Sequence, residues 1–205
     1  MSPHDPRLDP PDDTRTRLIV LFGGQSAEHD VSCTTASHVL RAADPAKYRI
    51  TPIGIARDGR WSVATGAAHA LSAGPDALPP QLDASGSVIE PTLAITPSGD
   101  EVTVVVPLLH GPLGEDGTVQ GMLELADLPY VGTGVLGSAV AMDKAMAKVV
   151  TAQHGIPQAR HLAFRATDIT PGTPQHVADA LGLPVFVKPA RAGSSLGISK
   201  VSDPA

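Results

Sequence analysis

The first part of the chain is divided into short apolar runs separated by turns that contain glycine and proline. Residues 18–22 are apolar throughout and lead directly into Gly23-Gly24, which is typical of a strand buried on both faces, as in a parallel sheet. Residues 102–107, β-branched and apolar, predict a second strand of this kind. Further runs predict strands at 48–55, 60–64 and 129–131. Residues 66–90 lack a clear period and predict a loop with at most one helical turn.

Helical spacing predicts helices between these strands. Over residues 28–43, small or apolar side chains recur every three or four positions, and Ser26 can cap the helix that they predict. Residues 118–126 predict a second helix, and residues 138–154 predict a long one that ends before Pro157. The side chains that define the first helix are Val31, Thr35, Val39 and Ala42.

The later part of the chain repeats the alternation, with predicted strands at 161–164, 185–188 and 197–201 and a helix at 173–181. Strands that alternate with helices predict an α/β layer fold. A change of pattern at 132–137 predicts a boundary between two α/β units. Residues 1–15 are rich in Pro and Asp and nearly free of apolar side chains, so they predict a disordered leader.

Composition narrows the class of protein. The 205 residues allow one or two domains, at about 150 residues per domain. The 15 basic and 21 acidic residues give a net charge of −6, and the absence of any Lys/Arg run argues against nucleic-acid binding. No apolar run approaches the ~20 residues of a membrane span, and the start of the chain does not resemble a signal peptide. We therefore expect a cytoplasmic enzyme or binding domain.

A single cysteine, Cys33, cannot form an internal disulfide, and we interpret it as a small core residue.

Residues 132–137 read GTGVLG and match the G-x-G-x-x-G pattern of dinucleotide-binding turns. The acidic residue expected about 20 positions later is missing, because 149–167 contains neither Asp nor Glu, and the strand predicted before the pattern is short. We interpret the segment as a turn between domains. A nicotinamide-dependent enzyme is the alternative reading.

Two loops follow the two strongest predicted strands and should open on the same edge of the sheet. In the first, Gly23-Gly24 allow a ligand to approach the backbone, and Glu28 lies where its carboxylate could meet an ammonium group. Glu28 could equally serve only the helix dipole. The second loop, 109–117, contains His110, Glu115 and Asp116 among three glycines, and it predicts a site, although Asp116 could simply cap the next helix.

The third stretch, 185–198, predicts a hairpin in which Lys188 ends an apolar strand and a Gly/Ser loop follows. Backbone N–H groups, hydroxyls and a fixed lysine suit phosphate binding, although the Walker A pattern is absent. A flexible surface hairpin is the alternative. Lys144, early in the predicted long helix, could be merely a solvated surface residue.

Five motifs taken together resemble D-alanine–D-alanine ligase, an ATP-grasp enzyme, in order from residue 17 to residue 201. They read GGQSAEHDVS (23–32), HGPLGEDGTVQGMLE (110–124), LPYVGTG (128–134), MDK (142–144) and VFVKPARAGSSLGISKV (185–201). The resemblance implies an N-terminal domain with a three-layer parallel sheet over 16–134. It also implies the incomplete start of an α+β ATP-grasp domain over 135–205.

The resemblance implies that ATP phosphorylates the carboxylate of one D-alanine and that the amine of a second D-alanine attacks the acylphosphate, for peptidoglycan precursor synthesis. It places Glu28 on the ammonium of the first substrate and Ser194 in a hydrogen-bonded link to Glu28. His110 matches a histidine near the reacting groups. The residues that match the site of the ATP phosphates are Lys144, Lys188 and Ser195.

The resemblance also implies Mg²⁺ or Mn²⁺, whose ligands we expect beyond residue 205, and a homodimer in the cytoplasm. We expect the chain to be a fragment that is inactive alone. Ala192 departs from the family pattern, which commonly has an acidic or polar residue there. A non-catalytic binding remnant, or a ligase that joins D-alanine to D-lactate or D-serine, remains an alternative.

Overall fold

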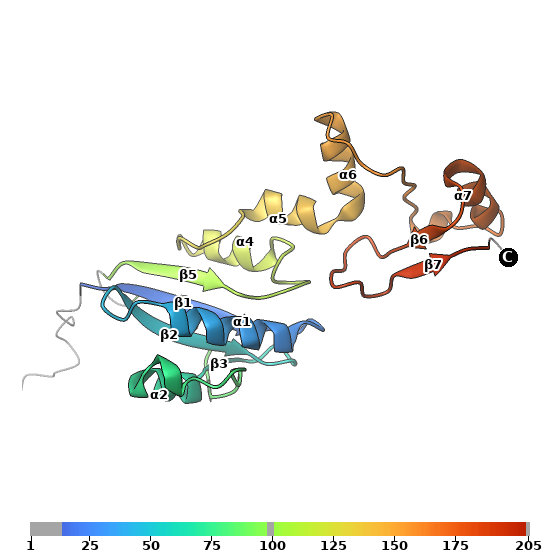
Figure 1. Cartoon of the computed structure of the whole chain (residues 1–205). Coiled ribbons are helices and arrows are strands. Elements are labelled where there is room, and N and C mark those ends of the chain that lie inside the picture. The colour runs from blue at the N-terminus through green and yellow to red at the C-terminus, as the bar shows by residue number, and fades with distance from the viewer. Residues whose placement is uncertain (1–13, 98–100, 204–205) are drawn as a thin grey trace, which may run out of the picture. The chain divides into compact units, whose positions relative to one another are not determined.

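The computed structural model describes residues 14–97 and 101–203, in two compact units, Met1–Val135 and Leu136–Ala205 (Figure 1). The expectation for residues 1–15 falls almost entirely outside the described residues. Nowhere in 14–97 or 101–203 is a helix long and apolar enough to cross a lipid bilayer.

The first unit is built on a mixed, mainly parallel sheet with the strand order β4-β3-β2-β1-β5. The interior strand β1 pairs in parallel with both β2 and β5, whereas β3 and β4 add antiparallel pairs at the other edge. The bounds are β1 Thr16–Gly23, β2 Tyr48–Ile55, β3 Trp61–Val63, β4 Ser87–Val88 and β5 Thr103–Pro107. The strands predicted at 18–22, 48–55, 60–64 and 102–107 are confirmed. The strand predicted at 129–131 contributes one parallel bridge, between Tyr130 and Val105.

Helices cover both faces of this sheet. Side chains of β1 alternate, so that Val20 and Phe22 enter one core and Ile19 and Leu21 the other. The first core is closed by α1 (His29–Ala42) and α2 (Thr65–Ala73), and the second by α3 (Pro91–Ile95) and α4 (Thr118–Leu125). Figure 1 shows α1 lying against β1. The predicted three-layer α/β architecture is confirmed.

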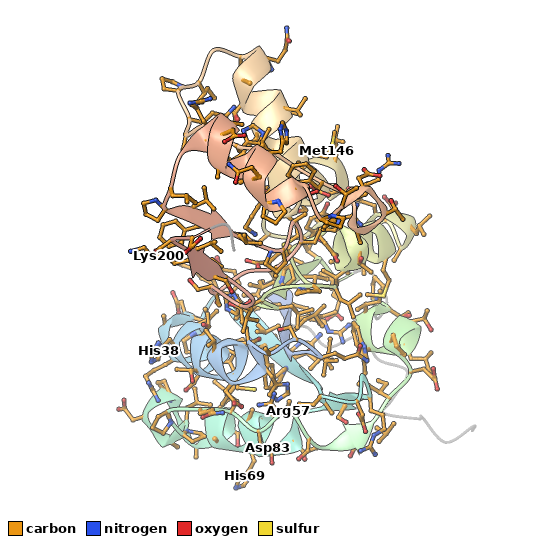
Figure 2. All side chains as sticks on the ribbon, turned by 90° about the vertical axis from the view of Figure 1, so that its right-hand side faces the viewer. His38, Arg57, His69, Asp83, Met146 and Lys200 are labelled. Atoms are coloured by element: carbon orange, nitrogen blue, oxygen red, sulfur yellow. The ribbon has the colours of Figure 1, made fainter. Side chains whose placement is uncertain are left out.

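The buried face of α1 differs from the predicted one. Val31 is 54% exposed, and His38, labelled in Figure 2, lies on the exposed face. Small side chains on the opposite face let the helix approach the sheet closely, and the hydroxyls of Ser32 and Ser37 are satisfied by the carbonyls of Leu108 and Pro79. The buried residues of α1 are His29, Ser32, Cys33, Ala36, Ser37 and Leu40, which confirms Cys33 as a core residue.

Residues 66–90 are more ordered than predicted. They contain most of α2, a 3₁₀ turn at Pro75–Ala77 and the short β4. Ala67, Leu78 and Leu82 enter the core that α1 also closes. The prediction failed because alanine-rich helices give little contrast between apolar and polar positions.

The second unit contains all but the first residue of α5 (Val135–Met142), together with α6 (Lys144–Gln153), α7 (Thr173–Leu181) and the antiparallel pair β6 (Val185–Val187) and β7 (Ser199–Val201). The hairpin predicted from 185–188 and 197–201 is confirmed with narrower bounds. The single helix predicted at 138–154 is wrong, because Asp143 interrupts it: its Oδ1 accepts hydrogen bonds from the N–H groups of Ala145 (3.0 Å) and Met146 (3.2 Å). Such capping starts a new helix.

The structure also tests the strand predicted at 161–164 and the glycine pattern at 132–137, and the predicted strand is wrong. Residues 161–164 form no strand, and Phe164 instead contacts the ring of His176 edge-on at 6.4 Å between centroids. The glycine pattern at 132–137 spans the division between the two units, and Gly137 lies inside α5. It is preceded by a single bridge residue rather than by the strand that a dinucleotide-binding turn requires.

Candidate functional site

The turn after β1 brings backbone groups to the carboxyl edge of the sheet. Gly23 and Gly24 have φ of 87° and 96°, and the Gly24 N–H donates to the Ile55 carbonyl (2.7 Å). A Cβ on Gly23 would lie 2.3 Å from the Ile55 oxygen, so only glycine fits there. The turn is therefore held against the end of β2.

Two side chains at the start of α1 fix this turn from the other side. His29 Nδ1 lies 2.7 Å from the Gly24 carbonyl oxygen. Ser32 Oγ accepts from the Gly23 N–H (2.8 Å) and donates to the Leu108 carbonyl (2.6 Å), which ties the end of β1 to the loop after β5. We did not predict either role. The only signal in the sequence was that both polar residues lie within one helical turn of Glu28.

Glu28 lies beside the loop after β5. It occupies the N-cap position of α1 without capping the helix through its side chain, and it is partly buried. Ser26, predicted as the cap, instead accepts from the Glu28 N–H (3.1 Å) and donates to the His110 carbonyl (2.7 Å). A Cβ on Gly111 would lie 2.9 Å from Glu28 Oε2. The two sequence-predicted loops are thus brought together at Glu28 and residues 110–111.

The loop after β5 is shaped by its own acidic residues. Glu115 Oε2 accepts from the Gly111 N–H (2.8 Å), and the Asp116 carboxylate accepts from the N–H groups of Leu113 (2.9 Å) and Thr118 (3.0 Å). Burial favours the neutral form of Asp116, but these N–H groups outweigh it and hold the pKa of Asp116 below its ordinary value. Both carboxylates therefore organise the loop. The N-cap of α4 is Gly117, without a side-chain cap, so Asp116 does not occupy the capping position.

His110 faces α1 and borders a cavity. Its Nε2 lies 3.5 Å from Thr35 Oγ1, a long hydrogen bond. The cavity, of about 200 Å³, is lined by the turn after β1, the hairpin between β2 and β3, the loop after β5 and the start of α4. Arg57 on that hairpin, labelled in Figure 2, pairs with Asp30 at the start of α1 (2.7 Å) and so links two of the elements around the edge.

The second unit holds the residues predicted to meet phosphates. Lys144 opens α6, and its ammonium donates to the Ala192 carbonyl in the hairpin loop. Lys188 directly follows β6 and is exposed. Ser194 and Ser195, also exposed, have φ of 45° and 61°, and this left-handed conformation turns the loop sharply. A lysine ammonium and a glycine- and serine-containing loop are thus held together, which is a donor set suited to phosphate oxygens.

Among residues 14–97 and 101–203, no group of three His, Cys, Asp or Glu side chains could hold a metal ion. The described residues therefore offer no cluster of three such side chains for Mg²⁺ or Mn²⁺.

Family models match both parts of the chain. Residues 17–133 match the D-ala D-ala ligase N-terminus and residues 150–204 match the D-ala D-ala ligase C-terminus. The curated D-alanine--D-alanine ligase of Nocardia farcinica is 47% identical over 204 residues, and D-alanine--D-alanine ligase A of Mesorhizobium japonicum is 46% identical over 199. Each alignment covers 92% of this chain and 54% of the relative, so the chain spans about half the length of these relatives.

Solved structures agree with this assignment. The D-alanine-D-alanine ligase from Coxiella burnetii aligns with a TM-score of 0.75 at 32% identity, over 93% of this chain and 57% of that one. The VanG D-Ala:D-Ser ligase from Enterococcus faecalis aligns with a TM-score of 0.70 at 34% identity, over 92% and 56%. One family model matches more than half of the residues of this chain, and the motif series and the layered fold agree with that match. This chain therefore belongs to the D-alanine–D-alanine ligase family.

Proposed function

We propose that this chain forms part of an enzyme that joins two D-alanines into D-alanyl-D-alanine with ATP, for peptidoglycan precursor synthesis. The observation that carries the proposal is the Glu28 carboxylate beside Gly111, at the carboxyl edge of the sheet, in a chain of this family. Ligands of open α/β sheets bind at this edge.

In the proposed reaction, Glu28 pairs with the ammonium group of the first D-alanine and fixes its orientation. The terminal phosphoryl group of ATP passes to the carboxylate of that D-alanine, and ADP leaves. The amine of the second D-alanine then attacks the acyl carbon, a proton is lost from nitrogen, and inorganic phosphate departs. His110, on the loop that Ser26 ties to the start of α1, lies near the reacting groups in this proposal. Holding reactants in this way accounts for much of the rate in such transfers.

The second unit supplies the nucleotide side of the proposed site. Lys144, Lys188 and Ser195 bind the ATP phosphates, and the positive charge of the two lysines stabilises the phosphoryl group during transfer. Ser194 links to Glu28 and helps to close the site. Mg²⁺ or Mn²⁺, when bound, would neutralise phosphate charge, and we expect its ligands outside the described residues.

Each of the two predicted domains has its own role in the proposed function. Residues 16–134 bind the first amino acid, and residues 135–205 form part of an ATP-grasp domain. We keep a cytoplasmic homodimer as a prediction that fractionation and light scattering would test. No partnership with nucleic acid or membrane is proposed.

The test is a phosphate-release assay on the longest gene product that contains this sequence. We expect ATP-dependent phosphate release with D-alanine, together with formation of the dipeptide. Release with another amino acid alone would overturn the D-alanine assignment, and ligand binding without turnover would support the non-catalytic alternative.

The VanG relative, named as a D-Ala:D-Ser ligase, motivates a second candidate, the joining of D-alanine to D-serine. Parallel assays with D-serine and D-lactate as second substrate separate these ligases by product mass.

A further inference from the structure

The Asp143 carboxylate does two separate things at the start of α6. Its Oδ1 accepts hydrogen bonds from the N–H groups of Ala145 and Met146 and so caps the helix, whose first turn is marked by Met146 in Figure 2. Its Oδ2 accepts from Arg191 Nε at 2.8 Å. A cap needs only one oxygen, and asparagine caps helices as well as aspartate does. The second oxygen and the charge of Asp143 are therefore committed to Arg191.

Arg191 lies in the loop between β6 and β7, and its two neighbours are also held by the start of α6. The Lys144 N–H donates to the Ala190 carbonyl at 2.9 Å, and the Lys144 ammonium donates to the Ala192 carbonyl. Three consecutive loop residues are thus bound to two consecutive residues at the helix N-terminus. We call this set of contacts the loop clasp.

We propose that Asp143 and Arg191 are positioning residues, which fix the loop of residues 188–198 on the start of α6 so that Lys144, Lys188 and Ser195 reach the ATP phosphates as one preformed set. This inference rests on the proposed function and adds to it two residues that do not themselves touch the substrate. Ordering the loop before the nucleotide arrives lowers the entropic cost of binding.

The exposure of Arg191 supports a positioning role of the pair over a stabilising one. The Arg191 side chain is 79% exposed and that of Asp143 is 14% exposed. Ion pairs with one partner in solvent contribute little to global stability. The bond from Arg191, together with the N–H groups of Met146 and Ala145, lowers the pKa of Asp143 and keeps it ionised at neutral pH.

The experiment compares Asp143→Asn and Arg191→Met in the longest gene product that contains this sequence. Asn keeps the helix cap and removes the charge, whereas Met removes the guanidinium and keeps much of the side-chain length. Arg60→Met is the matched control, since Arg60 Nε pairs with Asp58 at 2.7 Å, both side chains are exposed, and the pair lies in the other unit. The readouts are the ATP dissociation constant by calorimetry, hydrogen exchange of the Lys144 amide, KM for D-alanine and melting temperature.

We expect both variants to weaken ATP binding and to speed exchange of the Lys144 amide by about two- to fivefold, the range that a single ion pair with one partner in solvent supports. In both variants, KM for D-alanine and the melting temperature should stay at the wild-type values. In the control Arg60→Met, all four readouts should stay at the wild-type values. The double variant should bind ATP no more weakly than the single variant with the lower ATP affinity, because both substitutions remove the same contact.

Three results would overturn the inference. Wild-type ATP affinity in both variants would do so, as would unchanged exchange of the Lys144 amide. Unchanged or tighter ATP binding in Asp143→Asn, with weaker binding in Arg191→Met, would show that Arg191 acts on the phosphates directly. If the proposed function were wrong, the wild-type protein would show no ligation. The ATP affinity and the amide exchange rate test the loop clasp independently, because neither measurement requires turnover.

Discussion

Glu28 and Gly111 lie so close together that a side chain at Gly111 would meet the Glu28 carboxylate. A Cβ at that position would lie 2.9 Å from Glu28 Oε2 and 3.2 Å from the Ser26 Cβ. Gly111 also has a φ of 71°, in the left-handed region that other residues rarely adopt. The position of the Glu28 carboxylate therefore depends on a glycine that lies more than 80 residues later in the chain.

Gly111→Ala is expected to displace the Glu28 carboxylate and to lose at least tenfold in kcat/KM for D-alanine, since small displacements of a binding group reduce rates strongly. The left-handed backbone adds a stability loss of about 1 kcal/mol. Steady-state kinetics and denaturant unfolding measure the two effects. Gly66→Ala in α2, where a Cβ meets nothing within 4 Å, is the control and should leave both unchanged or slightly raise stability. Wild-type kinetics in Gly111→Ala would contradict the placement.

Glu28→Gln keeps the shape of the side chain and removes its charge. We expect a loss of activity of about a hundredfold or more with D-alanine, because an ammonium group loses its charge-assisted partner, and a change in unfolding free energy below about 0.5 kcal/mol. Glu90→Gln, at the exposed N-cap of α3, is the matched control. An unaltered rate in Glu28→Gln would return Glu28 to the role of a helix-start residue.

Ser194→Ala tests the predicted link to Glu28. Serine and alanine tolerate the φ of 45° equally badly, so we expect no fold defect and an unchanged melting temperature. Activity should fall about tenfold or more, because a hydroxyl that helps to close the site is lost. Ser202→Ala, also exposed and just after β7, should behave as wild type. Full activity in Ser194→Ala would remove this residue from the proposed site.

Cys33 is expected to be unreactive in the native protein. Burial raises the pKa of its thiol to about 11, with the carboxylates of Asp30 and Asp83 adding to the effect and Arg57 opposing it. From an ordinary value of 9.0, that rise lowers the thiolate fraction at neutral pH by about a hundredfold, and the side chain is 1% exposed.

Labelling with a thiol reagent should therefore be slow until denaturant is added. A variant with an exposed cysteine, Cys33→Ala combined with Ser202→Cys, provides the reference rate. Labelling of native Cys33 at that reference rate would contradict the buried placement.

Asp116 should make stability depend on pH in a defined direction. Its pKa is lowered in the folded protein, so its contribution is fully present above the ordinary carboxyl pKa of 3.8 and is lost as pH falls through the lower folded value. Asp116→Asn should cost about 1 kcal/mol at neutral pH, because one acceptor loses its charge. The difference between the two proteins should shrink below about pH 4. Melting curves from neutral to acidic pH measure it, and a difference that grew on acidification would contradict the predicted sign.

Local patterns in the sequence determined the strands and the candidate residues. The apolar run that ends at Gly23-Gly24 and the β-branched run at 102–107 identified β1 and β5, because burial on both faces leaves a continuous apolar signal. The motif series identified the family, and the family matches confirm it. What local pattern could not supply was the buried face of α1, because serines and a histidine form that face and their polar groups are satisfied by backbone atoms of other elements.

Only the tertiary structure decided how the edge of the sheet in the first unit and, separately, the loop clasp of the second unit are assembled. Ser26 reaches the His110 carbonyl, Ser32 joins the ends of β1 and β5, and Asp143 both starts α6 and holds Arg191. Each contact joins residues that lie 48 to 84 positions apart in the chain. Periodicity and turn preference act within a few residues, so they set which elements form. Contacts at such separation depend on how the elements pack, and that packing places Glu28 against Gly111.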